Sequence, residues 1–311
     1  MATIGNDTAG FTQLRLAHTR LGVVGDLHQH HERATAASSV KLSVVMPAYN
    51  EAATIRTAIE RILAIDFPCA VELIVVDDGS IDDTNAELAQ CDDPRLVRCA
   101  HPFNLGKGTA VRTGAAAATG THLLIFDADV EYDPKNIPEL MAPILDGTAD
   151  VVYGARIFGN HTVYPSMRFA IGNRLTTLAA NLLFDSYITD LHTCLKLIPL
   201  ATFRQLKLTE RGFGLDSEIT AELLRRGVRP YEIPVSYCGR SRAQGKKITW
   251  RDGVECLYVL AKVRARRLIG DAATGAKVPN NVTVDRFGND LDLTMACREG
   301  VLAELALPDL A

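Results

Sequence analysis

The sequence predicts an α/β fold with a mostly parallel central sheet flanked by helices. Short apolar runs rich in β-branched residues alternate with segments of helical spacing over residues 42–153, a pattern typical of a doubly wound sheet. The strand-like runs are apolar almost without interruption, as expected when helices cover both faces. Several of them end in polar clusters, and ligands of such sheets bind at the carboxyl ends of the strands.

Each element of the first half follows from a local pattern. Residues 42–47 form a β-rich run that ends at Pro47, and apolar positions 55, 59, 62 and 63 predict a helix over residues 52–64. Further strands are predicted at residues 71–76, 122–126 and 150–153, with helices at 108–118 and 137–145. We expect the polar clusters at residues 47–51, 77–80 and 127–129 to meet at one edge of the sheet.

The second half is less regular. Amphipathic helices are predicted at residues 168–184 and 218–226, a strand at 233–237 and a basic helix at 250–268. The helices at 168–184 and 250–268 could rest on a membrane interface through apolar faces and arginines, or could simply pack on the domain.

Composition narrows the class of protein. The chain has 311 residues, 47% of them apolar and 23% charged, which excludes wholesale disorder. A formal net charge of −4 argues against a nucleic-acid-binding protein. The sequence has no secretion-signal pattern and no long apolar window, so a spanning helix is not expected. The cysteines are odd in number without a Cys-x-x-Cys pair, which favours a reducing, cytoplasmic location over a disulfide framework or zinc site.

A pair of aspartates follows one buried strand. Asp127 and Asp129 would repel each other there unless a cation lies close to both. A hard divalent ion such as Mg²⁺ or Mn²⁺ prefers oxygen ligands and would also bind a diphosphate. Glu131 could complete the ligand set. The alternative is a pair of capping residues at a turn before the next helix.

Other polar residues suit a nucleotide. Asp78 could accept a hydrogen bond from a base or a ribose hydroxyl, or could belong to an ordinary turn. Tyr49 could stack on a base or simply pack. Lys107, between two glycines at a predicted helix start, suits an anion. Its surroundings match neither a Walker loop nor a dinucleotide fingerprint.

The combined motifs are more specific than their parts. Pro-Ala-Tyr-Asn-Glu at 47–51 is followed by Val-Val-Asp-Asp-Gly-Ser at 75–80, Asn-Leu-Gly-Lys-Gly at 104–108 and Phe-Asp-Ala-Asp at 126–129. In this order they resemble the family 2 glycosyltransferases with the GT-A fold, over roughly residues 41–267. Tyr-Gly-Ala-Arg at 153–156, Thr-Asp-Leu at 189–191 and Gly-Phe-Gly-Leu-Asp-Ser-Glu at 212–218 extend the resemblance to the dolichol-phosphate mannosyltransferase-like (polyprenyl-phosphate glycosyltransferase) branch.

This resemblance implies an inverting, metal-dependent transfer of a hexose from a UDP- or GDP-sugar to a polyprenyl phosphate. The nucleotide would be held by Pro47, Ala48, Tyr49, Glu51, Asp78, Lys107, Ala128 and Lys246. The metal ion, Mg²⁺ or Mn²⁺, would be held by Asp127, Asp129 and Glu131. The acceptor phosphate would face Arg156 and Arg168, and Arg240 with Lys246 would clamp the donor diphosphate from a basic loop.

A phosphate acceptor is already ionised, whereas a hydroxyl acceptor needs a base. Asp216 and Glu218 are the candidate bases, although Glu218 could equally be an exposed helix carboxylate. Gly172 stands where some relatives have a serine against the acceptor phosphate, so a soluble or secondary-metabolite hydroxyl remains the alternative acceptor. A sugar-nucleotide-binding protein without turnover is the alternative from another class.

The resemblance also divides the chain. Residues 1–40 are predicted to be a partly disordered extension, 41–237 the GT-A catalytic domain, 238–270 a basic clamp loop with an amphipathic helix, and 271–311 a tail without a readable role. We expect a cytoplasmic protein, peripheral at the membrane if the acceptor is a lipid, and able to form a homo-oligomer.

Overall fold

The computed structural model of the chain describes residues 40–156, 162–164, 166–240 and 250–274. The predicted extension at 1–40 and the predicted tail at 271–311 lie almost wholly outside these residues, as does Lys246. The division into domains therefore stays a prediction.

The described part of the chain is built on a seven-stranded sheet in the order β3-β2-β1-β4-β7-β5-β8. Only β7 runs antiparallel to its neighbours β4 and β5, so the predicted mostly parallel sheet is confirmed. The strands are β1 (Lys41–Ala48), β2 (Ala70–Asp77), β3 (Leu96–Ala100), β4 (His122–Ile125), β5 (Val152–Ala155), β7 (Lys196–Pro199) and β8 (Tyr231–Pro234). A separate pair joins β6 (Thr162–Val163) to β9 (Tyr237–Cys238).

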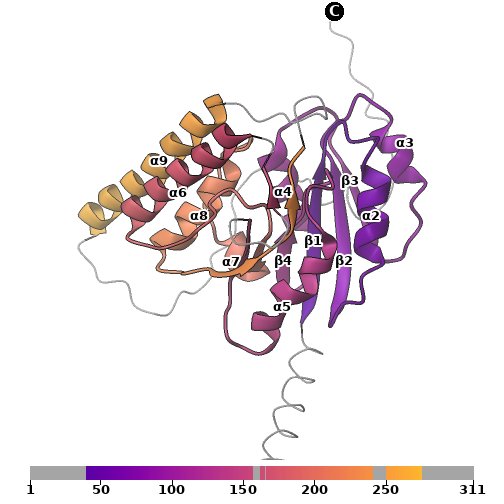
Figure 1. Cartoon of the computed structure of the whole chain (residues 1–311), viewed down its shortest axis with the longest axis horizontal. Helices are drawn as coiled ribbons and strands as arrows, with labels where there is room; N and C mark the ends of the chain where they lie inside the picture. The colour runs from indigo at the N-terminus through magenta and orange to yellow at the C-terminus, as the bar shows by residue number, and fades with distance from the viewer. Residues whose placement is uncertain (1–39, 157–161, 165, 241–249, 275–311) are drawn as a thin grey trace, which may run out of the picture.

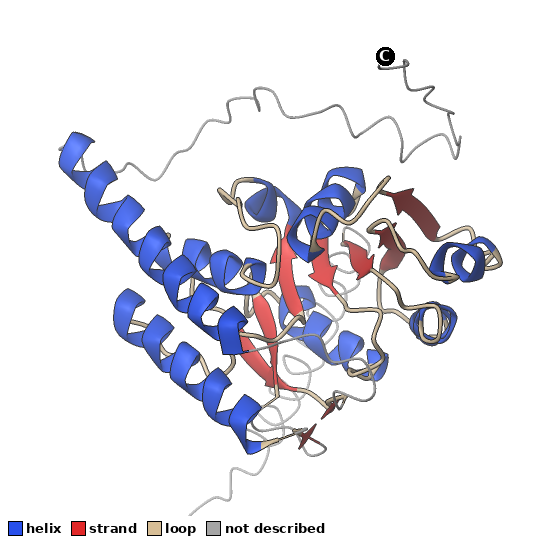
Figure 2. Ribbon diagram, turned by 90° about the horizontal axis from the view of Figure 1, so that it is seen from above, coloured by secondary structure: helices blue, strands red, loops and turns tan. Residues whose placement is uncertain are grey.

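Helices cover both faces of the sheet (Figures 1 and 2). On one face α2 and α5 pack on the strands, and on the other α4, α7 and α8 do so. The helices are α2 (Ile55–Leu63), α3 (Thr84–Ala89), α4 (Lys107–Ala117), α5 (Ile137–Leu145), α6 (Met167–Phe184), α7 (Leu200–Arg204), α8 (Leu215–Arg225) and α9 (Trp250–Thr274), with a short 3₁₀ turn at Pro134–Asn136.

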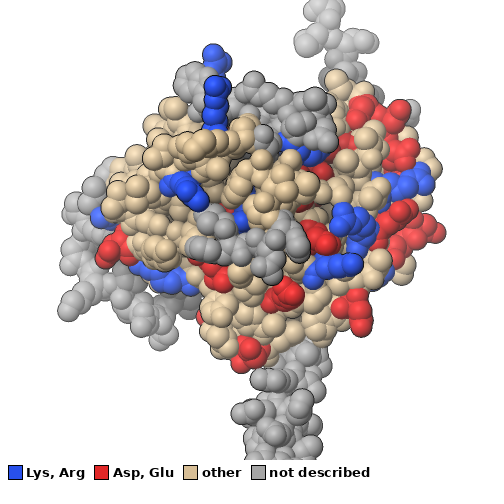
Figure 3. Space-filling view, in the orientation of Figure 1, with Lys and Arg blue, Asp and Glu red and all other residues tan. Residues whose placement is uncertain are grey.

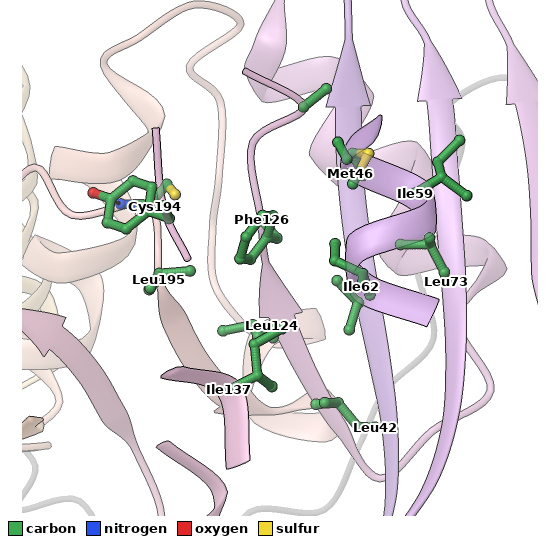
Figure 4. Packing of buried hydrophobic residues seen from close by; sticks show 14 of the residues in the cluster. Leu42, Met46, Ile59, Ile62, Leu73, Leu124, Phe126, Ile137, Cys194 and Leu195 are labelled. Atoms are coloured by element: carbon green, nitrogen blue, oxygen red, sulfur yellow. Dashed lines mark hydrogen bonds between the residues drawn. The ribbon is translucent and has the colours of Figure 1, made fainter. Parts of the chain in front are cut away.

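The continuous apolar strands serve two cores because neighbouring side chains point to opposite faces. Val44 and Met46 of β1 belong to the cluster with α2 and α5, whereas Val45 belongs to the cluster with α4 and α8. Figure 4 shows Ile59 and Ile62 of α2 packed over the strands of the first cluster. This close packing holds the carboxyl ends of β1, β2 and β4 in fixed positions.

Three short elements differ from the sequence-based expectation. The predicted strand at 233–237 is divided between β8 and β9, and the helix predicted at 218–226 begins earlier, at Leu215. The antiparallel strand β7 was not predicted, because Lys196 interrupts its apolar run.

A third layer forms where α6, α8 and α9 pack together (Figure 1). The side of α6 away from this core exposes large apolar side chains, and most of the surface in that part of Figure 3 lacks charge. The exposed residues are Met167, Ile171, Leu175, Leu178 and Leu182. No helix within the described ranges is long and apolar enough to cross a membrane.

Two cations of the predicted basic helix, α9, form ion pairs with the rest of the domain. Arg266 lies 3.5 Å from a carboxylate oxygen of Glu222 and 3.7 Å from one of Glu218, both on α8. Lys262 lies 2.7 Å from Glu210. These two cations therefore contribute to packing of α9 on the domain. Val254, Leu257 and Tyr258 of α9 are nevertheless exposed, as are the apolar residues of α6, so membrane contact through either helix stays a prediction.

Candidate active site

A cavity of about 1160 Å³ opens at the carboxyl ends of β1, β2 and β4 and extends to α6 and the start of α9. It brings together nearly all the described residues that the sequence singled out. These are Pro47, Ala48, Tyr49, Glu51, Asp78, Lys107, Asp127, Ala128, Asp129, Glu131, Arg156, Arg168, Asp216 and Arg240. Glu218 does not line it.

The loops after β1 and β2 are tied to each other at one end of the cavity. The Asn50 backbone N–H donates to Ser80 Oγ at 2.9 Å, and Asn50 Oδ1 accepts from the Ile81 N–H at 2.9 Å. Gly79, next to Ser80 in the loop after β2, has a positive φ of +67°. A Cβ there would lie 2.3 Å from the carbonyl carbon of Phe103, in the loop after β3. Only glycine fits this close approach of three loops.

Asp78 is buried and acts first as an anchor. Its carboxylate accepts from the backbone N–H groups of Leu105 and Gly106 at 3.0 and 2.8 Å, and lies 2.6 Å from His101 Nδ1. The ring of His101 is held in turn by Thr113 at 2.9 Å. Asp78 therefore fixes the turn that presents Lys107 to the cavity, and it also lines the cavity itself.

Asp127 and Asp129 follow β4 and both line the cavity. Burial, followed by the charges of Asp127 and Glu131, raises the pKa of Asp129 to about 7. Burial is the largest cause of this shift and the like charges of Asp127 and Glu131 add to it, so an added positive charge would favour the ionised form of Asp129. Carboxylate oxygens are the ligands that Mg²⁺ and Mn²⁺ prefer, so Asp127 and Asp129 fit a divalent ion as two of its ligands.

Glu131, the third predicted ligand, is directed elsewhere. One of its carboxylate oxygens accepts from the Tyr237 hydroxyl at 2.5 Å and the other from the Arg240 backbone N–H at 2.7 Å. Within the described residues no three His, Cys, Asp or Glu side chains gather as a metal site. These contacts make Glu131 a residue that fixes the start of the basic loop, and its role as a third ligand stays a prediction.

Arg240 spans the opening between the loops after β1 and β4. Its guanidinium lies 3.0 and 3.2 Å from the two oxygens of Glu51 and 3.3 Å from Asp129 Oδ2. Burial alone would lower the pKa of Arg240, but these carboxylates raise it. A cation is thus already held beside the predicted diphosphate position.

Lys107 forms an ion pair with Asp127, the other aspartate after β4. Its Nζ lies 2.9 Å from Asp127 Oδ1 and 3.0 Å from Oδ2, and 3.5 Å from Asp216 Oδ2. Asp216 Oδ1 accepts from Lys196 Nζ at 3.2 Å. Burial alone would lower the pKa of Lys107, yet the charges of Asp127 and Asp216 raise it above its usual range. Sequence analysis missed Lys196, although a lysine within an apolar run requires a buried counter-charge.

Glu218 is not the base that the sequence suggested as one alternative. Its side chain is fully buried and accepts from the backbone N–H groups of Thr209 and Glu210 at 2.7 and 2.8 Å and from the Thr209 hydroxyl at 2.9 Å. It therefore holds the loop before α8 and neither lies in the cavity nor stands exposed on the helix.

The predicted acceptor arginines differ from each other. Arg156 is held by Asp190, with its Nε and Nη2 donating at 2.6 and 2.7 Å, and its guanidinium lies 5.0 Å from the ring centre of Tyr237. Burial opposes the charge of Asp190, but Arg156 and Asn173 hold its pKa well below the usual range. Arg168 is exposed at the first turn of α6. A phosphate would thus meet one fixed and one adaptable cation.

Comparison with known proteins decides the family. The family model described as glycosyl transferase family 2 matches residues 43–204, which is more than half of the chain. The chain belongs to this family. It is 29% identical to glycosyltransferase AglD of Haloferax volcanii over 213 residues, covering 66% of this chain and 34% of that protein. It is 27% identical to glycosyltransferase AglJ of the same organism over 198 residues, covering 63% of each. The chain thus spans less than two thirds of either relative.

Solved structures support the GT-A fold of this glycosyltransferase. Glucosyl-3-phosphoglycerate synthase from Mycobacterium tuberculosis, crystallised with Mn²⁺, UDP and glucosyl-3-phosphoglycerate, matches with a TM-score of 0.55 at 20% identity over 75% of this chain and 83% of that one. Mannosyl-3-phosphoglycerate synthase from Rubrobacter xylanophilus matches with a TM-score of 0.56 at 18% identity, covering 78% and 79%. At these identities the likeness extends to the fold alone.

Proposed function

We propose that this glycosyltransferase transfers a hexose, with inversion, from a nucleotide-diphosphate sugar to a polyprenyl phosphate, as in the dolichol-phosphate mannosyltransferase-like branch. The observation that carries the proposal is the composition of the cavity. It has carboxylates and cations at the sheet edge, two arginines further along, and apolar side chains of α6 at its outer end.

The sheet-edge end suits the donor. Tyr49, Glu51 and Asp78 line the part that a nucleoside would enter, and Asp127 with Asp129 would hold a Mg²⁺ or Mn²⁺ ion. When bound, the ion would offset negative charge on the leaving diphosphate. Lys107 and Arg240, now paired with these carboxylates, lie where they can turn to the diphosphate and stabilise the charge that develops on it.

The outer end suits an acceptor with a phosphate and a hydrocarbon chain. Arg156 and Arg168 line the cavity beside Phe169 and Leu175 of α6. Leu175 is 61% exposed, and Leu178, its neighbour on the same side of the helix, is 53% exposed. A soluble protein rarely leaves such a row of apolar side chains in water, and a prenyl chain could lie along it.

The state of Asp216 favours a phosphate over a hydroxyl acceptor. Burial would raise the pKa of Asp216, but Lys107 and Lys196 lower it below its usual value. A carboxylate held by two ammonium groups is a weak base. A phosphate oxygen needs no proton removed before it attacks the anomeric carbon, so the reaction can proceed without such a base.

The experiment is an acceptor comparison with radiolabelled UDP- and GDP-hexoses in the presence of Mn²⁺. We expect a butanol-extractable product with a polyprenyl phosphate and none with 3-phosphoglycerate or a free hydroxyl acceptor. A water-soluble product alone would favour the hydroxyl alternative, and donor binding without any transfer would favour the sugar-nucleotide-binding protein.

Two variants separate the ends of the cavity. Asp129→Asn should abolish transfer to every acceptor, since it removes a carboxylate from the donor end. Leu175→Gln should raise the KM for a polyprenyl phosphate and leave donor hydrolysis unchanged. Leu182→Gln is the matched control in solution assays, because Leu182 is 76% exposed on the same helix but does not line the cavity.

A further inference from the structure

Four side chains of alternating charge form a row from the interior to the donor end of the cavity. Lys196 lies innermost and is fully buried, and Asp216 is 6% exposed. Asp216 uses one carboxylate oxygen for Lys196, at 3.2 Å, and the other for Lys107, at 3.5 Å. Lys107 contacts both oxygens of Asp127 at 2.9 and 3.0 Å.

The inner end of the row is rigid. Besides Asp216, Lys196 Nζ donates to the backbone carbonyl groups of Leu191, at 3.1 Å, and Thr193. It also lies 5.2 Å from the ring centre of Tyr153, which is fully buried. Lys196 therefore has no room to leave Asp216, and its strand β7 lies within the sheet between β4 and β5.

The outer end of the row is adjustable. Lys107 stands at the first residue of α4 and lines the cavity, so its flexible stem can move its Nζ between Asp216 and Asp127. As long as the Nζ contacts both oxygens of Asp127, a divalent ion that needs this carboxylate must compete with it. Lys196 compensates part of the negative charge of Asp216. The more of that charge it compensates, the more weakly Asp216 attracts Lys107 away from Asp127.

We propose that Lys196 is a positioning residue that, through Asp216, sets how firmly Lys107 occupies Asp127 and so tunes the affinity of this centre for its divalent ion. This inference rests on the proposed ion site at Asp127 and Asp129. Removal of the Lys196 charge leaves Asp216 to Lys107 alone, draws Lys107 off Asp127 and eases ion binding. Removal of the Asp216 charge leaves Asp127 as the remaining ion-pair partner of Lys107 in this row, which strengthens that contact and hinders ion binding.

The test is a titration of the full chain with MnCl₂ alone, followed by the EPR signal of free Mn²⁺. Lys196→Met should tighten Mn²⁺ binding about threefold or more and Asp216→Asn should weaken it by a similar factor, as expected for charges at this distance in a partly buried site. Lys196→Arg keeps the charge and should restore near-normal binding. Lys262→Met is the matched control, since Lys262 of α9 pairs with Glu210 of the loop before α8 and neither residue lines the cavity.

A double-mutant cycle isolates the route through Lys107. Lys107→Met should itself tighten Mn²⁺ binding, and in that background Lys196→Met should have little further effect. An equal effect of Lys196→Met with and without Lys107 would overturn the proposed route. If Lys196→Met does not fold, Lys107→Met and Asp216→Asn still have to change binding in opposite directions.

The outcomes separate this inference from the function on which it rests. If the unaltered chain binds Mn²⁺ and both Lys196→Met and Asp216→Asn weaken binding, the residues are merely structural and this inference alone fails. If the unaltered chain binds no Mn²⁺, the ion site of the proposed function fails with it. Opposite shifts of the two variants support both.

Discussion

The buried ion pair of Arg156 and Asp190 should be among the strongest single contributions to stability beside the cavity. Asp190 is fully buried and accepts from Arg156 Nε at 2.6 Å, Nη2 at 2.7 Å and the backbone N–H at 3.1 Å, and from Asn173 Nδ2 at 2.9 Å. Asp190→Asn keeps the shape but replaces one acceptor oxygen by an NH₂ group that faces other donors. It also leaves the charge of Arg156 without its partner.

The size of the loss follows from burial. Charge-assisted hydrogen bonds contribute about 1.5–3 kcal/mol each and are not additive, and removal of one partner of a buried pair costs about 3–5 kcal/mol. We expect a loss of about 3–5 kcal/mol for Asp190→Asn. Because the folded pKa of Asp190 lies below its unfolded value, its contribution is fully present above about pH 4 and is lost as the pH falls further. Urea unfolding at pH 7, followed by circular dichroism, therefore measures all of it.

The chain offers a matched control on its surface. Arg95 Nε and Nη2 donate to Asp93 at 3.0 and 2.9 Å, but these two side chains are 37% and 24% exposed. Asp93→Asn should cost about 0–1 kcal/mol. The double variant Arg156→Met/Asp190→Asn should be less destabilised than Asp190→Asn, because no unpaired charge stays buried. A loss for Asp190→Asn no greater than that for Asp93→Asn would refute the reasoning.

Three further predictions test other parts of the molecule. Gly79→Ala should lose at least about 2 kcal/mol more in unfolding free energy than Gly147→Ala, because both have a positive φ but only Gly79 has backbone within contact of an added Cβ; equal losses in urea unfolding would contradict the close approach. Burial, then Arg156, lowers the pKa of His192 to about 4, so its contribution to stability is present above about pH 6.5 and falls by up to about 3 kcal/mol towards pH 4; His192→Asn should remove this part of the pH profile, and an unchanged profile would refute it. Leu182→Gln should reduce co-sedimentation with anionic liposomes, whereas Ile81→Gln, on the distant loop after β2, should not; equal effects would argue against contact through α6.

The meeting of three polar clusters in one cavity could be predicted from the sequence because parallel strands bring their carboxyl ends to one edge. The clusters after β1, β2 and β4 each follow an apolar run, so their meeting point needs no knowledge of tertiary contacts. The error at Glu218 has a simple geometric cause. Two residues along a helix are about 200° apart, so Asp216 faces the cavity while Glu218 faces the loop at Thr209.

Partners from distant parts of the chain could not be predicted. Arg156 and Asp190 are 34 residues apart, and Lys196 and Asp216 are 20 residues apart. No periodic pattern links such positions, since each pairing depends on how the antiparallel strand β7 enters the sheet. A buried lysine within an apolar run signals only that some carboxylate must approach it.

The cations at the sheet edge of the cavity form ion pairs with the carboxylates beside them. Lys107 lies on Asp127, and Arg240 lies on Glu51 and Asp129. Arg240 also lies 3.7 Å from Glu131, so carboxylates outnumber cations in this cluster. Burial is the largest cause of the raised pKa of Asp129, and the charges of Asp127 and Glu131 add to it. A divalent cation bound at Asp127 and Asp129 would supply positive charge to these carboxylates, and Lys107 and Arg240 would then be free to turn towards the oxygens of a bound diphosphate. If the proposed donor site is correct, the side chains that compensate the carboxylates before binding would stabilise the leaving group afterwards, with little solvent reorganisation.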